Sequence, residues 1–149
     1  MDIIAITDIT QYEPQITDFG IQEFSAEITR ASADVFRDLK IRWWPTQQSG
    51  LYDLKILETG RQEPNDNNYD INQLKRACVY QALGFHIYPK LAKFEPGEDI
   101  FERKMMFYRK EYERELDLIL REGVKYDIDS SGTITNAEKQ SESFLRLKR

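Results

Sequence analysis

The chain has 149 residues, a length that suits one domain able to bury a hydrophobic core. Asp and Glu number 26 against 21 Lys and Arg, a formal net charge of −5. This acidic balance argues against a general nucleic-acid binder, because neutralising phosphates requires a basic face. The one cysteine, Cys78, rules out an intramolecular disulfide, and we expect it to be a buried small apolar residue.

The opening segment, MDIIAITDIT, has neither a basic region nor a sustained apolar run. A signal peptide needs both, and a membrane-spanning helix needs about 18 or more apolar residues in succession. We therefore expect a soluble protein that does not contact a membrane and carries no cleaved signal.

A long amphipathic helix is predicted from Thr17 to Trp44, because its apolar residues recur mostly every three or four positions with charged residues between them. Thr17 or Asp18 would cap its start, and Pro45 would end it. Successive helical residues point about 100° apart, so at most one of Trp43 and Trp44 is expected to face the core of its own subunit. The apolar positions are Phe19, Phe24, Ile28, Ala31, Val35, Phe36 and Leu39.

Residues 45–70 form a predicted long surface loop, in which residues 51–57 could be a short strand or a turn of helix. Two further helices follow. The first is predicted from Asp70, its cap, to Leu91, with Pro89 kinking or ending it, and the second from Asp99 to Gly123.

Together these elements predict an all-α fold, a small antiparallel helical bundle with a long loop and an extended C-terminal tail. The predicted domains are the bundle, residues 1–123 with the loop at 45–70, and a tail of residues 124–149 that carries an EF-hand-like loop.

The sequence DIDSSGTITNAE, residues 127–138, matches an EF-hand calcium loop at every ligand position. Gly132 stands at the sixth position, where the chain needs a positive φ. The same residues also suit an ordinary tight turn followed by a helix with a capping box, so both interpretations stay open. The predicted calcium ligands are Asp127, Asp129, Ser131, Thr133, Thr135 and Glu138.

No enzyme signature accompanies this loop. His86 is the only histidine, which leaves no partner for a zinc site or a catalytic triad, and the seven glycines are too scattered to cradle a phosphate. The stripe of Met105, Met106, Phe107, Tyr108 and Tyr112 indicates a core or a subunit interface. We therefore predict that the protein is not an enzyme.

Several segments together resemble the head-to-tail connector (adaptor) proteins of tailed bacteriophages. They are the stretch from TDFGIQEF through VFRDLKIRWWP, the Tyr-rich LKRACVYQALGFHIYPKL, the charged third helix and the terminal DIDSSGTI segment. The resemblance covers most of the chain.

This resemblance implies a structural virion protein, assembled in the host cytoplasm, that forms a homo-oligomeric ring, commonly of twelve subunits. The ring would lie in the neck beneath the portal protein and join it to the next neck or tail protein, with genomic DNA passing through without specific binding. Loop 45–70 and the C-terminal tail would reach adjoining rings. The alternatives are a single-EF-hand calcium-binding regulator, another neck protein such as a stopper or tail-completion protein, and an enzyme whose site the sequence does not reveal.

Overall fold

The computed structural model describes residues 1–44, 63–92, 97 and 99–136. These residues are mostly helical and contain no strand, which confirms the all-α fold class. The segment that could be a strand or a helical turn, residues 51–57, lies outside the described residues.

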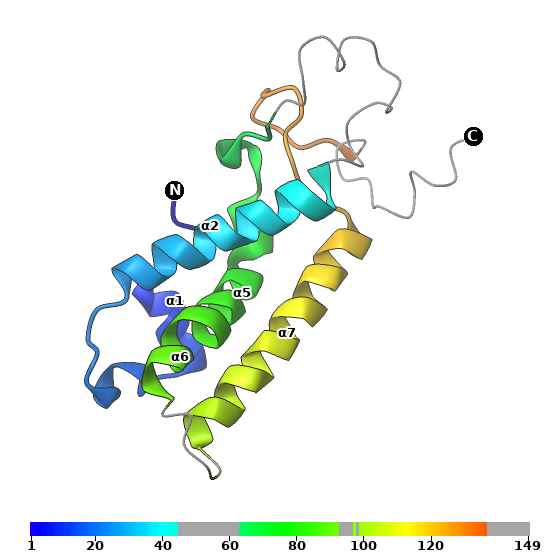
Figure 1. Ribbon diagram of the computed structural model, residues 1–149. Coiled ribbons are helices and arrows are strands. Elements are labelled where there is room, and N and C mark those ends of the chain that lie inside the picture. The colour runs from blue at the N-terminus through cyan, green and yellow to red at the C-terminus, as the bar shows by residue number, and fades with distance from the viewer. Residues whose placement is uncertain (45–62, 93–96, 98, 137–149) are drawn as a thin grey trace.

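The long helices pack directly on one another. Helix α2 (Ser25–Arg42) and helix α7 (Ile100–Glu122) both lie beside helix α5 (Ile71–Gln81), and the short helix α1 (Ile6–Tyr12) lies on the other side of α5 from α7 in the view of Figure 1. Their apolar faces meet in one core, which is rich in aromatic side chains. Its largest fully buried side chains include Trp43, Tyr88, Tyr112, Phe24, Leu39, Leu74 and Leu116.

The N-terminal segment differs from the prediction, because α1 was not expected and the long helix begins later than Thr17. In α1 the backbone N–H of Ala5 donates to the Asp8 carboxylate at 2.8 Å. Residues Ile16–Phe19 form a 3₁₀ turn, η1, that ends at Gly20 with φ 97°. A residue in the left-handed conformation ends a helix, so helix α2 begins only at Ser25. Phe19, which lies before this break, is 41% exposed.

The second predicted helix begins where expected and changes its winding before it ends. The Asp70 side chain caps α5 by accepting a hydrogen bond from Asn72 N at 3.1 Å. A π-helical turn, η3 (Ala82–Ile87), and helix α6 (Tyr88–Leu91) follow. Pro89 has no N–H and therefore cannot donate the usual helical hydrogen bond. In the wider π-helical turn before it, Tyr88 N donates to the carbonyl of Leu83, five residues earlier.

Helix α7 agrees with its prediction at both ends. Asp99 caps it by accepting a hydrogen bond from Phe101 N at 3.0 Å, and Gly123, with φ 102°, ends it. The helix packs unusually close to η3, because a Cβ on Gly84 would lie 2.9 Å from Arg109 N and 3.1 Å from the carbonyl carbon of Tyr108. The Arg109 Nε atom donates to the Gly84 carbonyl at 3.0 Å, which fixes this contact.

Residues 63–70 lead from the undescribed part of the predicted loop into α5. A 3₁₀ turn, η2 (Asp66–Asn68), is capped by the Asn65 side chain, and Tyr69 then forms an antiparallel bridge with Tyr126. The chain on either side of this bridge is held by hydrogen bonds from Asp70 N to the carbonyl of Lys125 and from Asp127 N to that of Asn68. The end of the helical core near Trp43 is therefore closed by residues that follow α7.

Candidate functional site

The loop predicted to bind calcium is organised around the carboxylate of Asp127. Its two oxygens accept hydrogen bonds from Ser131 N at 3.1 Å and from Gly132 N at 2.6 Å. Gly132 has φ 83°, which confirms the predicted left-handed turn, and no atom lies within 4 Å of where its Cβ would be. Glycine is thus required here by the backbone conformation and not by packing.

The middle of the loop is tied together by its own polar groups. Asp129 Oδ1 accepts a hydrogen bond from Ser131 N at 3.0 Å, and Ser131 Oγ donates to the carbonyl of Thr133 at 3.2 Å. Hydrogen bonds from Ser131 are the main reason that the pKa of Asp129 lies below its ordinary value, so this carboxylate stays ionised. A negative charge close to the Asp127 carboxylate suits a cation.

An amide from a distant part of the chain fixes the loop to the residues that precede α5. Asn68 Nδ2 donates to the carbonyl of Asp127 at 2.9 Å and to Ser130 Oγ at 3.0 Å. The sequence places Asn68 only within the predicted loop 45–70 and does not reveal this role, because nothing local connects residues 68 and 127. Asp127 is only 8% exposed, whereas Asp129 is exposed.

The structure places five of the six predicted ligands in one loop, and Glu138 lies outside the described residues. Within the described ranges no group of three or more His, Cys, Asp and Glu side chains could hold a metal ion. The described carboxylates of the loop are Asp127 and Asp129, and the charge that would complete a calcium site is the one expected from Glu138. Calcium binding therefore stays a prediction that depends on this residue.

An aromatic cluster lies directly beside the loop and consists of Trp43, Trp44, Tyr69 and Tyr126. Tyr126 contacts the other three, with ring centroids 5.4 Å from Trp43, 5.3 Å from Trp44 and 4.8 Å from Tyr69. Trp43 is fully buried, whereas Trp44 is half-buried against the edge of the core. The two indoles thus differ in burial, as their adjacent helical positions predict.

His86, Asp34 and Gln81 are paired with one another within the subunit. His86 Nε2 is 2.7 Å from Asp34 Oδ2, which also accepts a hydrogen bond from Gln81 Nε2 at 3.1 Å. Cys78 is fully buried, as predicted, and its burial raises the pKa of its thiol to about 12, which disfavours the nucleophilic thiolate. Asp34 and Gln81 lie with His86 where α2 meets the end of α5, a position that links two helices.

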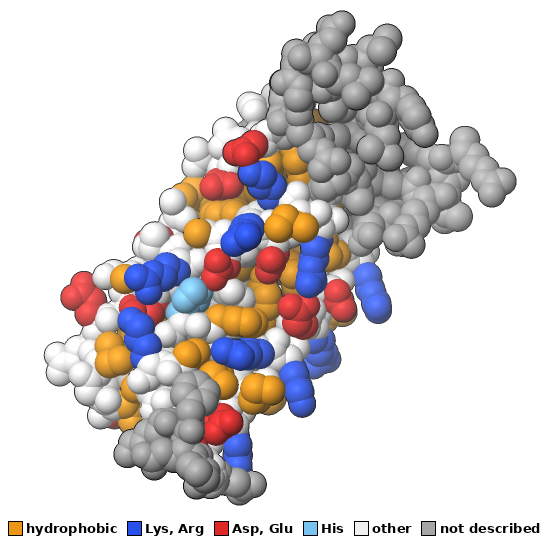
Figure 2. All heavy atoms as spheres, viewed as in Figure 1, with side chains coloured by type: hydrophobic (Ala, Val, Ile, Leu, Met, Phe, Trp, Pro, Cys, Tyr) orange, Lys and Arg blue, Asp and Glu red, His pale blue; other side chains and the backbone are white. Residues whose placement is uncertain are grey.

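A second feature is the outer face of α7, which carries exposed apolar and basic side chains. The apolar ones are Ile100, Met106, Phe107 and Leu118, which are 63%, 48%, 55% and 47% exposed. Near the start of the helix, Met106 and Phe107 border an open groove of about 470 Å³. Its other lining residues are Gly97, Asp99, Glu102, Arg103 and Lys110. Figure 2 shows basic, acidic and hydrophobic side chains interspersed along the side of the molecule where α7 lies.

The Met and aromatic stripe divides between two environments. Met105, Tyr108 and Tyr112 are buried in the core, as one of the two expectations had it, whereas Met106 and Phe107 are exposed. The subunit interface stays a prediction for the exposed part of the stripe.

Comparisons of the chain with known protein families, curated proteins and solved structures find no match. In the described part of the chain, no helix is both long enough and apolar enough to cross a membrane.

Proposed function

We propose that this protein is a subunit of a head-to-tail connector ring in the neck of a tailed bacteriophage. In this proposal the antiparallel bundle forms the wall of the ring, which docks beneath the portal protein and receives the next neck or tail protein. The tail with its EF-hand-like loop contacts an adjoining ring, and genomic DNA passes through without specific binding.

The observation that carries the proposal is the outer face of α7. Four large apolar side chains on one helix are each about half exposed or more. Contiguous exposed apolar surface is typical of protein interfaces, and interface cores favour Met, Phe and Arg. An assembly that buries this face removes that apolar surface from water, which favours a structural role over that of an isolated monomer.

The EF-hand-like loop suits a structural clip in such an assembly. Asn68 and Tyr126 already hold its first half on the bundle, so an ion would order the residues that follow. A calcium sensor instead opens a pair of helices to expose an apolar groove. Here the apolar groove on α7 is open and is lined by residues 97–110, which do not include the loop.

Electron microscopy of the purified full-length chain, alone and together with the portal protein of its phage, tests this proposal. We expect closed rings with rotational symmetry, and the same ring in the neck of the virion. A chain that forms no ring in either setting and does not occur in the virion neck would refute the connector function. A monomer that exposes new apolar surface on adding calcium would instead support the regulatory alternative.

A further inference from the structure

The first 29 residues form an acidic surface layer. They contain six carboxylates and no Lys or Arg, since Arg30 is the first basic residue of the chain. Two of the six are already paired within the subunit: Glu13 with Lys104 at 2.9 Å, and Glu27 with Lys90. The other four are Asp2, Asp8, Asp18 and Glu23.

Large apolar side chains are exposed in the same layer. Met1, Phe19 and Tyr12 are 53%, 41% and 38% exposed, and Asp2, Asp18 and Glu23 are exposed near them in the sequence. This acidic N-terminal layer, residues 1–29, therefore combines negative charge with apolar contact area. A surface of this kind suits a partner that is basic and apolar.

The outer face of α7 has that composition. Four basic residues recur at intervals of 7, 4 and 7 positions, which places them along one side of the helix. Phe107 and Leu118 are exposed beside them, and Arg114 is 71% exposed although it lies 3.6 Å from Glu111. Asp117 and Glu122 are the exposed acidic residues on this side, because Glu113 turns toward α2 and pairs with Arg42. The basic residues are Arg103, Lys110, Arg114 and Arg121.

Exposed basic residues on α2 offer a weaker match. Arg30 and Arg37 are exposed on this helix, but the exposed residue midway between them is the small Ala33. The α2 surface therefore supplies charge with one large exposed apolar side chain, Ile41, which is 61% exposed, whereas the outer face of α7 supplies four such side chains together with its basic residues.

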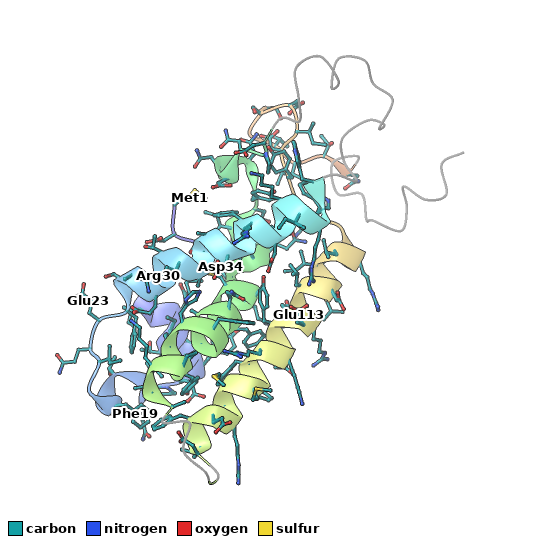
Figure 3. The ribbon with its side chains drawn as sticks, viewed as in Figure 1. Met1, Phe19, Glu23, Arg30, Asp34 and Glu113 are labelled. Carbon is teal, nitrogen blue, oxygen red and sulfur yellow. The ribbon has the colours of Figure 1, made fainter. Side chains whose placement is uncertain are left out.

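The two complementary surfaces are different faces of the subunit that adjoin near the start of α7, where the ring centroids of Phe19 and Phe101 lie 4.9 Å apart. Figure 3 shows Met1, Glu23 and Phe19 along one edge of the molecule, and Glu113 on α7 at the other side. A face that met its own copy would place carboxylates against carboxylates or basic groups against basic groups, which is unfavourable. Contact between two different faces of successive subunits is heterologous and generates rings or open filaments.

We propose that the acidic N-terminal layer of one copy of this chain docks on the outer face of α7 of the next copy. This inference rests on the proposed ring function and names the two surfaces that join its subunits. The exposed carboxylates of one subunit lie against the basic side chains of the next, and Phe19 and Tyr12 supply apolar contacts to Phe107 and Leu118.

Paired charge reversals test the contact directly. One full-length variant carries Lys110→Glu and Arg114→Glu on α7, and a second carries Asp18→Lys and Glu23→Lys in the N-terminal layer. The matched control carries Arg30→Glu and Arg37→Glu on α2. Far-UV circular dichroism and thermal unfolding establish that each variant is folded, and sedimentation velocity at low ionic strength measures self-association up to about 1 mM protein.

We expect the wild-type chain to self-associate and to dissociate as salt is added, because exposed charge pairs are screened. Each of the two interface variants should weaken self-association at least about tenfold, whereas the control should change it little. An equimolar mixture of the two interface variants should associate again. One variant then has two acidic faces and the other two basic faces, so alternating copies restore both contacts.

Three results would overturn the inference: a wild-type chain that stays monomeric under these conditions, a mixture that does not recover association, or a control variant that is equally impaired. The proposed function is judged separately. Rings that persist in electron micrographs of the α7 variant would leave the connector function standing and show that other surfaces join the subunits.

Discussion

Replacing Gly84 by alanine should destabilise the protein, although the same change inside an ordinary helix stabilises it. Gly84 lies in the π-helical turn η3 and faces the backbone of α7. An alanine Cβ would be 2.9 Å from Arg109 N, whereas ordinary contacts of a Cβ begin at 3.4 Å. The neighbouring atoms are mostly backbone, so the two helical segments would have to separate.

The expected change in the free energy of unfolding is the sum of three contributions, one that favours alanine and two that disfavour it. Alanine is favoured over glycine in a helix by about 1 kcal/mol. Forcing an extra methyl group into a packed contact costs about 1–3 kcal/mol. Separation would also weaken the hydrogen bond from Arg109 Nε to the Gly84 carbonyl, which contributes about 0.5–1.5 kcal/mol. The net effect on the free energy of unfolding is a loss of about 2 kcal/mol, or a decrease in Tm of about 4–8 °C for a chain of this size.

Urea unfolding of the full chain, followed by far-UV circular dichroism, measures this change. The control is Ala33→Gly on the exposed side of α2, which should cost about 1 kcal/mol through helix propensity alone. If Gly84→Ala leaves the protein as stable as the wild type, or makes it more stable, the close contact between η3 and α7 does not constrain this position and the reasoning fails.

Three further predictions concern other parts of the molecule. Burial raises the pKa of Glu13, but hydrogen bonds from Tyr108 and Lys104 outweigh burial and hold this pKa below its ordinary value. Glu13→Gln should therefore lower the free energy of unfolding, measured with urea at neutral pH, by about 1–2 kcal/mol. The difference between variant and wild type should disappear as the pH falls through the lowered pKa. Trp43→Ala should lower the free energy of unfolding by about 3–5 kcal/mol because this indole is fully buried, whereas Trp44→Ala should mainly impair ring assembly. Equal losses of stability in the two variants would contradict this division. Titration with calcium should release or absorb heat and should protect the tail from proteolysis, and both effects should be lost when Asp127→Ala and Glu138→Ala are combined. A wild-type chain that does not respond at millimolar calcium would favour the turn with a capping box.

The helix ends that could be predicted from the sequence are those fixed by local chemistry. The carboxylates of Asp70 and Asp99 each cap the helix that follows, and Gly123 adopts the positive φ that ends α7. In each case a side chain or a backbone conformation acts within a few residues. Such signals are visible in a single sequence.

The N-terminal part could not be predicted as well, because its apolar spacing continues through a break in the backbone. Phe24 is buried as helical spacing predicts, but Phe19, which belongs to the same predicted spacing, is 41% exposed, because Gly20 separates the two into different elements. The π-helical turn after α5 also has no clear sequence signal beyond Pro89. Both features are decided by tertiary packing, which overrides local preference.

The candidate calcium loop illustrates the same limit. The positive φ of Gly132 follows from the motif, whereas the hydrogen bonds of Asn68 to the loop join residues about 60 positions apart in the sequence. Likewise, helical spacing alone did not indicate which members of the Met and aromatic stripe face solvent. The neighbours of a helix decide which of its sides is covered.

The chain that follows α7 links the candidate calcium loop to the core. Val124 is fully buried and Tyr126 is 4% exposed, and the side-chain amide of Gln73 binds both Gly123 O, at 2.9 Å, and Lys125 N, at 2.8 Å. The first residues of the predicted tail, 124–149, are therefore part of the hydrophobic core. Asp127 follows directly on Tyr126, whose ring contacts both tryptophans at the end of α2. An ion bound by the Asp127 carboxylate would therefore lie next to this aromatic cluster. We expect ion binding to change the order of the loop and the environment of the two indoles together.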